Sequence, residues 1–599
     1  MKLSKFISEL KRRHVFKSTI AYLAISWVVI QIASVLLPAL DIPDTALRVL
    51  IYILAVGLVF WIGFSWYYDL TSEGIQKTDA LDTSPESLQL ANRRLNKVIA
   101  GSLAVGVLLL LVISFWAGST WNEGPAIPEI KKVAVIPFST SMVNEEEAYF
   151  QSGMTDELIN QLSKVDRLKV IHQRSTKILT SGFDQTSSLV LNVIKGIDYF
   201  VEGSFERETD GINVHMTLRE SIDEEPIWQK SYAKDLSQIR VMWVDIAADL
   251  ARQMGFAVRP ANVKFGSGRQ PVDPEAYALY LKGKHYMNKS TLADWERGLV
   301  YLQEARDRNP ADANTWAWLS EAFIILGHGS PNSPPDTFPK ALEAAERAIE
   351  LDSTVALGWA SLSHFHTYIG RDWAMAEYAF IRSNALDPNL ADNHFHRAWY
   401  LAIFGRMNEA IEEHKLAQEL DPFTTYQTAW LGELYRWVGM YEEGIEQTEK
   451  ASLMSEKGDF DYSVSMLIRG WIYIDQGKEE EGLELLKQCA ELNPFWKYPG
   501  YGLALLKTGH IEEGKAILIE MEQMPPNDFF DLFIGIYYAY LGDYDKSFEV
   551  WKIENMDPWF IGLRVMWVPD EIRKDSRFIQ LMRDMNLPDP APLEYDPES

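Results

Sequence analysis

The feature that most constrains this chain is a set of glycines that recur at a near-constant interval in its C-terminal half. Each glycine closes an apolar run with helical spacing, and successive glycines lie 43, 35, 34, 38, 32 and 33 residues apart. They are Gly327, Gly370, Gly405, Gly439, Gly477, Gly509 and Gly542. A period of this length holds one pair of antiparallel helices, which can bury its apolar face only against neighbouring pairs. The chain is therefore expected to stack helical hairpins.

Other residues come into register when these glycines are placed at position 15 of a 34-residue unit. Position 8 then falls on Gly432, Gly470, Gly502 and Gly535, and position 32 on Pro422, Pro494 and Pro526. Small residues are needed where two helices cross closely, and proline suits the turn that ends the second helix. This pattern is typical of the tetratricopeptide repeat. It predicts about eight hairpins over residues 274–586, forming an all-α, right-handed superhelix that ends in a capping helix.

Residues 131–256 have a different pattern, in which short β-branched runs alternate with amphipathic segments. Strands are predicted at 132–138, 168–171, 199–203, 212–218 and 226–232. The runs VAVIPF, YFQSGMTDELINQLSKVDRLKVI and GIDYFVEGSF resemble a TolB-like N-terminal domain. That resemblance implies a small α/β domain placed between a membrane anchor and tetratricopeptide repeats.

Three apolar stretches occupy residues 18–37, 47–68 and 98–117. Each is close to the ~20 residues that cross a bilayer, so residues 1–120 are predicted to form a membrane anchor of three transmembrane α-helices. Lysine and arginine precede the first stretch and lie between the second and third, whereas the connection between the first two has neither. The N-terminus is therefore expected in the cytoplasm, and residues 121–599 on the periplasmic side of the inner membrane.

Charge and cysteine content exclude several classes of function. Residues 1–120 hold 11 basic and 8 acidic residues, which leaves 46 basic and 76 acidic residues in the remainder. A part this acidic repels phosphate backbones, so nucleic acid is not an expected partner. The single cysteine, Cys489, excludes disulfides within the chain and thiolate zinc clusters. It occupies repeat position 27, where other units have alanine, and is expected to pack between helices.

No metal, cofactor or catalytic site is expected. The His-Phe-His triplets at 364–366 and 394–396 suggest metal ligands, but side chains two residues apart on a helix point ~200° apart and cannot bind one ion. The motifs HExxH, GxxxxGK[ST] and GxSxG do not occur in the sequence. The chain is therefore predicted not to be an enzyme.

The leading prediction is a membrane-anchored scaffold that docks a protein or peptide partner in the concave groove of its repeats. In tetratricopeptide repeats, positions 2, 5, 9, 12 and 13 of the first helix face that groove. The aligned frame and the earlier units assign to it His364, Tyr368, Trp399, Tyr426, Arg436, Trp437, Trp471 and Trp496. Two alternatives stay open. In the first, the aromatic residues fill the core of the superhelix. In the second, the chain is a sensory subunit that signals across the membrane to a cytoplasmic partner.

Overall fold

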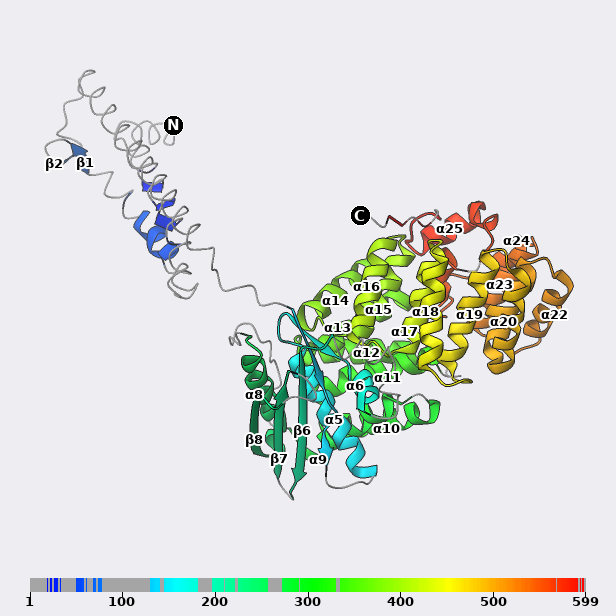
Figure 1. Ribbon diagram of the computed structural model, residues 1–599. Coiled ribbons are helices and arrows are strands. Elements are labelled where there is room, and N and C mark those ends of the chain that lie inside the picture. The colour runs from blue at the N-terminus through cyan, green and yellow to red at the C-terminus, as the bar shows by residue number, and fades with distance from the viewer. Residues whose placement is uncertain are drawn as a thin grey trace, which may run out of the picture. The chain divides into compact units, whose positions relative to one another are not determined.

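The computed structural model divides the chain into two compact units, Met1–Ile127 and Pro128–Ser599 (Figure 1). In the second unit it describes residues 130–140, 145–180, 196–208, 211–220, 225–256, 272–289, 291–329, 334–566, 568–590, 593, 595 and 596. In the first unit it describes residues 19, 22, 23, 26, 27, 29, 30, 33, 50–58, 61, 68–71 and 74–77.

The prediction of three transmembrane helices is contradicted. Within the described residues, no helix has the length and apolar character needed to cross a bilayer. Spans 18–37 and 47–68 are described only in part, and span 98–117 lies outside the described residues. At the end of the second span the backbone is extended, because β1 (Tyr68–Thr71) pairs antiparallel with β2 (Gly74–Lys77). The predicted multi-pass inner-membrane localisation and the periplasmic placement of residues 121–599 depended on these spans and are contradicted with them.

A mixed sheet forms the first part of the second unit. Its strand order is β5-β3-β6-β7-β8, with the short β4 paired to β6. β3 is parallel to both β5 and β6, whereas β6, β7 and β8 form an antiparallel meander. The strands are β3 (Lys131–Val135), β4 (Ser139–Thr140), β5 (Leu168–Ile171), β6 (Tyr199–Arg207), β7 (Gly211–Arg219) and β8 (Trp228–Asp235). Except for β4, which was not predicted, each strand overlaps one of the segments predicted to be strands.

Helices α5 (Glu145–Leu162) and α8 (Ile239–Gln253) supply the apolar core beside this sheet. Trp243 on α8 is fully buried and meets Phe138 edge-to-face, with 5.7 Å between the ring centroids. Phe138 also explains a glycine in β6, because a Cβ atom on Gly203 would lie 2.2 Å from its ring. The helix α6 (Gln173–Thr180) follows β5, and its Arg174 and Ser175 side chains contact Asp421 of the repeats.

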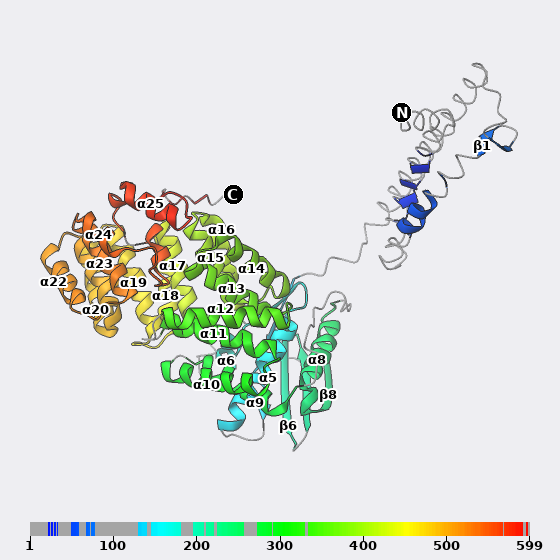
Figure 2. The ribbon, with the colours of Figure 1, turned by 180° about the vertical axis from the view of Figure 1, so that it is seen from behind.

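The remainder of the described chain forms eight consecutive helical hairpins, which Figures 1 and 2 show as an arc from α9 to α24. Their helices are α9 (Pro274–Met287), α10 (Leu292–Arg308), α11 (Ala313–Gly329), α12 (Pro334–Leu351), α13 (Ala356–Phe365), α14 (Trp373–Leu386), α15 (Ala391–Ile403), α16 (Met407–Leu420), α17 (Thr425–Trp437), α18 (Tyr441–Met454), α19 (Phe460–Asp475), α20 (Glu479–Leu492), α21 (Leu503–Lys507), α22 (Ile511–Glu522), α23 (Asp528–Tyr540) and α24 (Tyr544–Val550). Short helical turns extend two of them, η5 (His366–Gly370) after α13 and η6 (Pro494–Lys497) with η7 (Tyr498–Gly502) before α21.

Glycines perform two separate tasks in these hairpins. Those that end the first helix have a left-handed backbone, with φ between 78° and 85° from Gly405 to Gly542, a conformation that costs glycine little because it lacks a Cβ atom. Glycines inside the helices permit close crossing instead. A Cβ atom on Gly470 would lie 2.6 Å from Cγ of Leu486, and one on Gly482 would lie 2.8 Å from the Gly470 carbonyl oxygen.

The chain after α24 returns across the earlier repeats before it ends in α25 (Ser576–Asp584), close to the predicted capping helix. Arg371 donates hydrogen bonds to the carbonyl oxygens of Ile553 and Asn555. Arg564, in the short η8 (Phe560–Arg564), donates from Nη1 to the Ile403 carbonyl oxygen at 2.6 Å. The segment therefore contacts the third and fourth hairpins.

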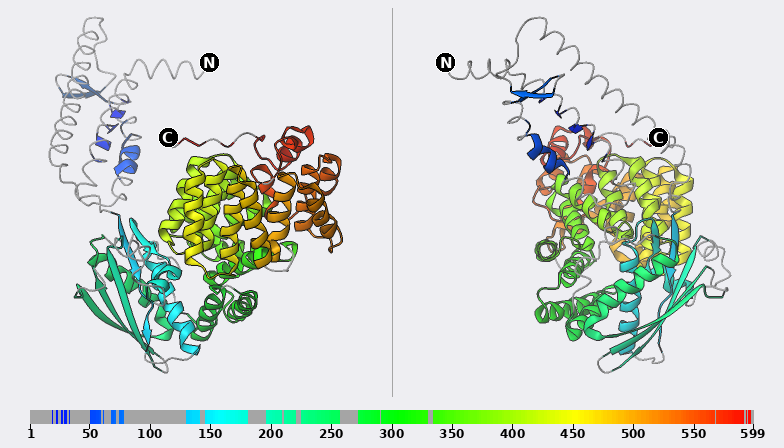
Figure 3. Two further views of the ribbon diagram at one scale, coloured as in Figure 1. Left: turned by 45° about the vertical axis from the view of Figure 1, so that its right-hand side comes forward. Right: turned by 90° about the vertical axis from the view of Figure 1, so that its left-hand side faces the viewer.

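Helix-to-helix turns of the repeats contact the α/β domain. At the turn between α14 and α15, the Asn389 side chain donates to the carbonyl oxygens of Ser163 and Leu168. At the turn between α16 and α17, the backbone NH of His172 donates to the Leu420 carbonyl oxygen at 2.9 Å. Figure 3 shows α5 and α6 on the side of the domain that faces the repeats.

Candidate functional site

A cavity of about 1270 Å³ lies between the α/β domain, the first helices of the hairpins and the C-terminal segment. The first helices of successive hairpins, α11, α13, α15, α17, α19 and α23, all contribute lining residues. The opposite boundary is made by α5, by the β5–α6 connection and by residues 557–566 of the returning segment. The cavity therefore follows the inner face of the repeat array and is bounded by parts of the chain outside that array.

Aromatic rings form one wall of the cavity. Trp399 and Trp430 meet at 5.1 Å between ring centroids, and Trp430 meets Trp559 of the C-terminal segment at 6.1 Å. Two further rings on this wall are accessible to solvent, since Phe460 is 46% and Phe495 is 36% exposed. Exposed phenylalanines inside a cavity are an apolar surface that the chain itself leaves uncovered.

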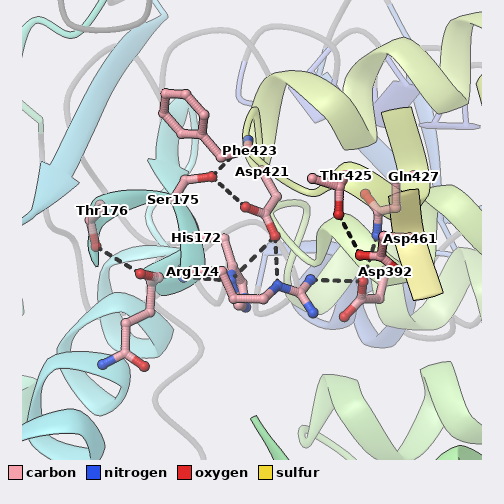
Figure 4. Close-up of polar contacts among 11 residues, drawn as sticks. His172, Arg174, Ser175, Thr176, Asp392, Asp421, Phe423, Thr425, Gln427 and Asp461 are labelled. Carbon is pink, nitrogen blue, oxygen red and sulfur yellow. Dashed lines mark hydrogen bonds and ion pairs between the residues drawn. The ribbon is translucent and has the colours of Figure 1, made fainter. Parts of the chain in front are cut away.

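A polar network lies at the junction of the α/β domain and the repeats (Figure 4). Arg174 of α6 donates from Nε to Asp421 at 2.8 Å and from Nη2 to Asp392 at 3.0 Å. Gln427 donates from Nε2 to the same oxygen of Asp392 at 2.6 Å. Burial alone would raise the pKa of Asp392, but the Arg174 guanidinium outweighs it and lowers that pKa to about 2. Asp392 is therefore ionised, and Arg174 forms ion pairs with two carboxylates.

Three other carboxyl groups of the cavity form no ion pair like that between Asp392 and Arg174. Burial is the main cause that raises the pKa of Glu321 to about 7, with the charge of Asp392 adding to it. Burial raises the pKa of Asp557 to about 7 as well, and shifts the pKa of Asp461 upwards. Asp461 accepts a hydrogen bond from the Thr425 hydroxyl. Within the described part of the chain, none of these three carboxylates forms an ion pair with lysine or arginine.

Three histidines from successive hairpins meet on the same inner face. Nε2 of His328 and Nε2 of His364 are 2.7 Å apart, and the Tyr368 hydroxyl lies 3.1 Å from Nδ1 of His396. Burial lowers the pKa of His396 to about 4 and that of His364 well below its usual range. The two buried rings are therefore neutral near pH 7. Among the described residues, no group of three or more histidine, cysteine, aspartate or glutamate side chains is placed to hold a metal ion.

The structure brings only half of the sequence-predicted partner residues to this cavity. Four of them line it: His364, Tyr368, Trp399 and Tyr426. Trp471 and Trp496 are 2% and 1% exposed in the main core of the repeats. Arg436 is buried and paired with Glu433 and Asp475, and the half-buried Trp437 donates from Nε1 to Glu433 at 2.9 Å. For Trp471 and Trp496, the geometry favours the core-packing alternative. Partner contact by the four lining residues stays a prediction.

The sequence frame held a signal for two residues that the prediction left out. Glu321 occupies repeat position 9, and Asp392 occupies position 2, both of which are groove positions in that frame. The sequence-based prediction of the groove does not include Glu321 and Asp392, because it takes only aromatic residues and arginine at those positions. Arg174 and Trp559 had no such signal, because they lie outside the repeat units.

Comparison with known proteins agrees with the repeat period. The tetratricopeptide repeat family model matches residues 465–495, which cover most of α19, all of α20 and the start of the turn after α20. The chain carries tetratricopeptide repeats. The matched unit contains Gly470, Gly477 and Gly482, the same glycines that set the crossing and the end of the first helix.

Two curated relatives match part of the chain. "Putative adenylate cyclase 3" of Rhizobium meliloti (strain 1021) is 25% identical over 243 residues, which is 40% of each chain. "Transcriptional regulator HilA" of Salmonella typhimurium is 26% identical over 168 residues, 28% of this chain and 30% of the relative. The chain thus spans less than half the length of either relative.

Solved structures also match. YrrB, described as a tetratricopeptide protein with an unusual peptide-binding site, is 18% identical with a TM-score of 0.24, and the match covers 32% of this chain and 92% of YrrB. The MamA protein is 19% identical with a TM-score of 0.22, and the match covers 30% of this chain and 93% of MamA. PilW, a type IV pilus biogenesis factor, is 12% identical with a TM-score of 0.26, covering 40% and 90%.

Proposed function

We propose that this chain is a non-enzymatic scaffold that binds an extended peptide segment of a partner protein in the cavity on the inner face of its tetratricopeptide repeats. Stacked helical hairpins commonly use their concave surface in this way. The observation that carries the proposal is the pair of exposed rings, Phe460 and Phe495, within a cavity of about 1270 Å³. Their burial by an apolar peptide side chain would supply binding energy that the free chain does not realise.

The features beside the rings support a binding role over catalysis. Charged groups in the cavity are largely engaged in fixed networks, as Arg174 is with Asp392 and Asp421. The thiol of Cys489 is buried, and burial raises its pKa to about 12, so it is not an activated nucleophile. We also propose that the α/β domain at 131–256 is TolB-like and that it closes one side of the binding cavity.

The proposal is tested with a phage-displayed library of random dodecapeptides selected on the full chain. Selected peptides should lose roughly tenfold in affinity, about 1.4 kcal/mol, with Phe460→Ala or Phe495→Ala. Leu453→Ala is the matched control, because Leu453 is 76% exposed on α18 and does not line the cavity. Thermal melting checks that the variants stay folded. Peptides that bind equally to all four proteins, or no selectable peptide at all, would refute the proposal.

A further inference from the structure

We propose that the cavity recognises an arginine side chain of its peptide partner, at a subsite formed by Glu321, Asp461 and Gln427. This inference rests on the proposed peptide-binding function and specifies the chemistry of the ligand. The three residues lie on α11, α17 and α19 and all line the cavity. Figure 4 shows Asp461 and Gln427 beside Asp392, the carboxylate to which both Gln427 and Arg174 donate.

Most cations that line the cavity are already paired with the chain's own carboxylates. Arg240 forms two hydrogen bonds to Asp312, at 2.6 and 2.9 Å. Ion pairs also join Arg174 to Asp392 and Asp421, Lys284 to Asp156, and Lys289 to Asp294. Lys164, the remaining lysine or arginine among the described lining residues, donates a hydrogen bond to Gln161 at 3.4 Å, and burial lowers its pKa. Four of the five described lining cations are thus paired within the chain.

The negative charge of the cavity is not balanced in the same way. Glu321, Asp461 and Asp557 line it without an ion pair to any described lysine or arginine. An anionic ligand would disfavour the ionised forms of these carboxyl groups further, whereas a cationic ligand would favour them and pair with them. Charge complementarity therefore favours a basic peptide segment as the ligand of the cavity.

A buried hydrogen-bond acceptor further restricts the chemical groups that the ligand can present. Gln427 is 2% exposed; its Nε2 donates to Asp392, while its Oε1 has no hydrogen-bond partner. Buried polar atoms are almost always satisfied in folded proteins, so Oε1 is suited to receive a donor from a ligand. A ligand that reaches Oε1 and the two nearby carboxylates must present several N–H groups and a positive charge together.

An arginine side chain meets all of these requirements. Its guanidinium is planar, always charged and carries five N–H donors in a fixed fork, whereas lysine has a compact ammonium group. Tyr426 provides a flat aromatic surface beside Asp461, and its ring lies 5.8 Å from Phe395 and 6.0 Å from Trp430. Guanidinium groups stack on such faces, so the aromatic wall and the carboxylates would bind the same side chain.

The test uses the peptides selected on the full chain from the random dodecapeptide library. They should be enriched in arginine, and replacing arginine by citrulline, which keeps the shape but removes the charge, should weaken binding at least tenfold. In the Glu321→Gln/Asp461→Asn double variant, the preference for arginine over citrulline should fall below threefold. The control variant, Glu479→Gln/Glu480→Gln, removes two exposed charges at the start of α20 and should keep the full preference.

The outcomes separate this inference from the function on which it rests. If selected peptides bind at the cavity, as Phe460→Ala shows, but tolerate citrulline, then the scaffold function stands and the arginine subsite is refuted. If the control variant loses the preference as much as the double variant, general charge attraction explains it and the subsite is also refuted. If no peptide responds to Phe460→Ala, the peptide-binding function itself has failed.

Discussion

The buried ion pair between Arg240 and Asp312 joins the α/β domain to the repeats, and its removal makes a quantitative prediction. Arg240 lies on α8, and Asp312 precedes α11. Their side chains are only 7% and 9% exposed, and two parallel hydrogen bonds connect them. Arg240→Met keeps an apolar chain over the rings of Tyr277 and Tyr280 but leaves the Asp312 carboxylate buried without its cation.

Removing one partner of a buried pair costs about 3–5 kcal/mol, because the remaining charge is desolvated without compensation. Arg240→Met should therefore lower the free energy of unfolding of the full chain by that amount at pH 7, measured by urea denaturation. In hydrogen-exchange measurements, the backbone amides of α8 and α11 should lose protection. The double variant Arg240→Met/Asp312→Asn should be more stable than Arg240→Met alone, because the uncompensated charge is gone while the Thr315 side chain can still bond to residue 312.

The same variant has a predicted pH dependence. In the native chain burial acts to raise the pKa of Asp312, but Arg240 outweighs it and keeps that pKa below the usual range. Without Arg240 the folded-state pKa of Asp312 should rise above its unfolded value of about 3.9, so that folding takes up a proton. The stability gap between the native chain and Arg240→Met should then narrow as pH falls from 7 towards 4.5. A gap below about 1 kcal/mol at pH 7, or one that does not change with pH, would refute this reasoning. Arg306→Met removes a more exposed pair with Asp307 and should cost less than about 1 kcal/mol.

Two further predictions concern the repeats. Gly470→Ala should lower the free energy of unfolding by about 1–3 kcal/mol in urea denaturation, because its Cβ atom would lie 2.6 Å from Leu486 at a helix crossing. Gly358→Ala, whose nearest contacts would be at 3.3 Å, should be within about 1 kcal/mol of neutral, and equal effects at both sites would contradict the crossing argument. Stability should also fall as pH drops from 7 towards 5, because His364 and His396 have folded-state pKa values below the unfolded value and unfolding takes up protons. His364→Gln should reduce that loss in thermal melts, and an unchanged pH profile would contradict it.

The local architecture could be predicted because it depends on short-range rules. The glycine period marks where each first helix ends, since a left-handed backbone at Gly405 or Gly439 is favourable only for glycine. β-branched runs such as 168–171 mark strands because they fit a pleated, half-buried surface. The same short-range reasoning was wrong for the transmembrane helices. An apolar stretch satisfies the length rule, but the described residues 68–71 pair as a strand and no described helix qualifies as a span.

The cavity depends on contacts between distant parts of the chain, which repeat positions alone do not contain. Trp399 and Trp471 share position 9, yet Trp399 lines the cavity and Trp471 lies in the core beside Arg436 and Lys507. Which aromatic ring stays accessible is decided by the segments that cover the inner face, such as the one that carries Trp559. The sequence by itself thus determined the hairpins and their register, because backbone conformation and helix crossing are set within a repeat. Only the tertiary structure decided which groove residues form the site, because burial depends on what packs against them from elsewhere in the chain.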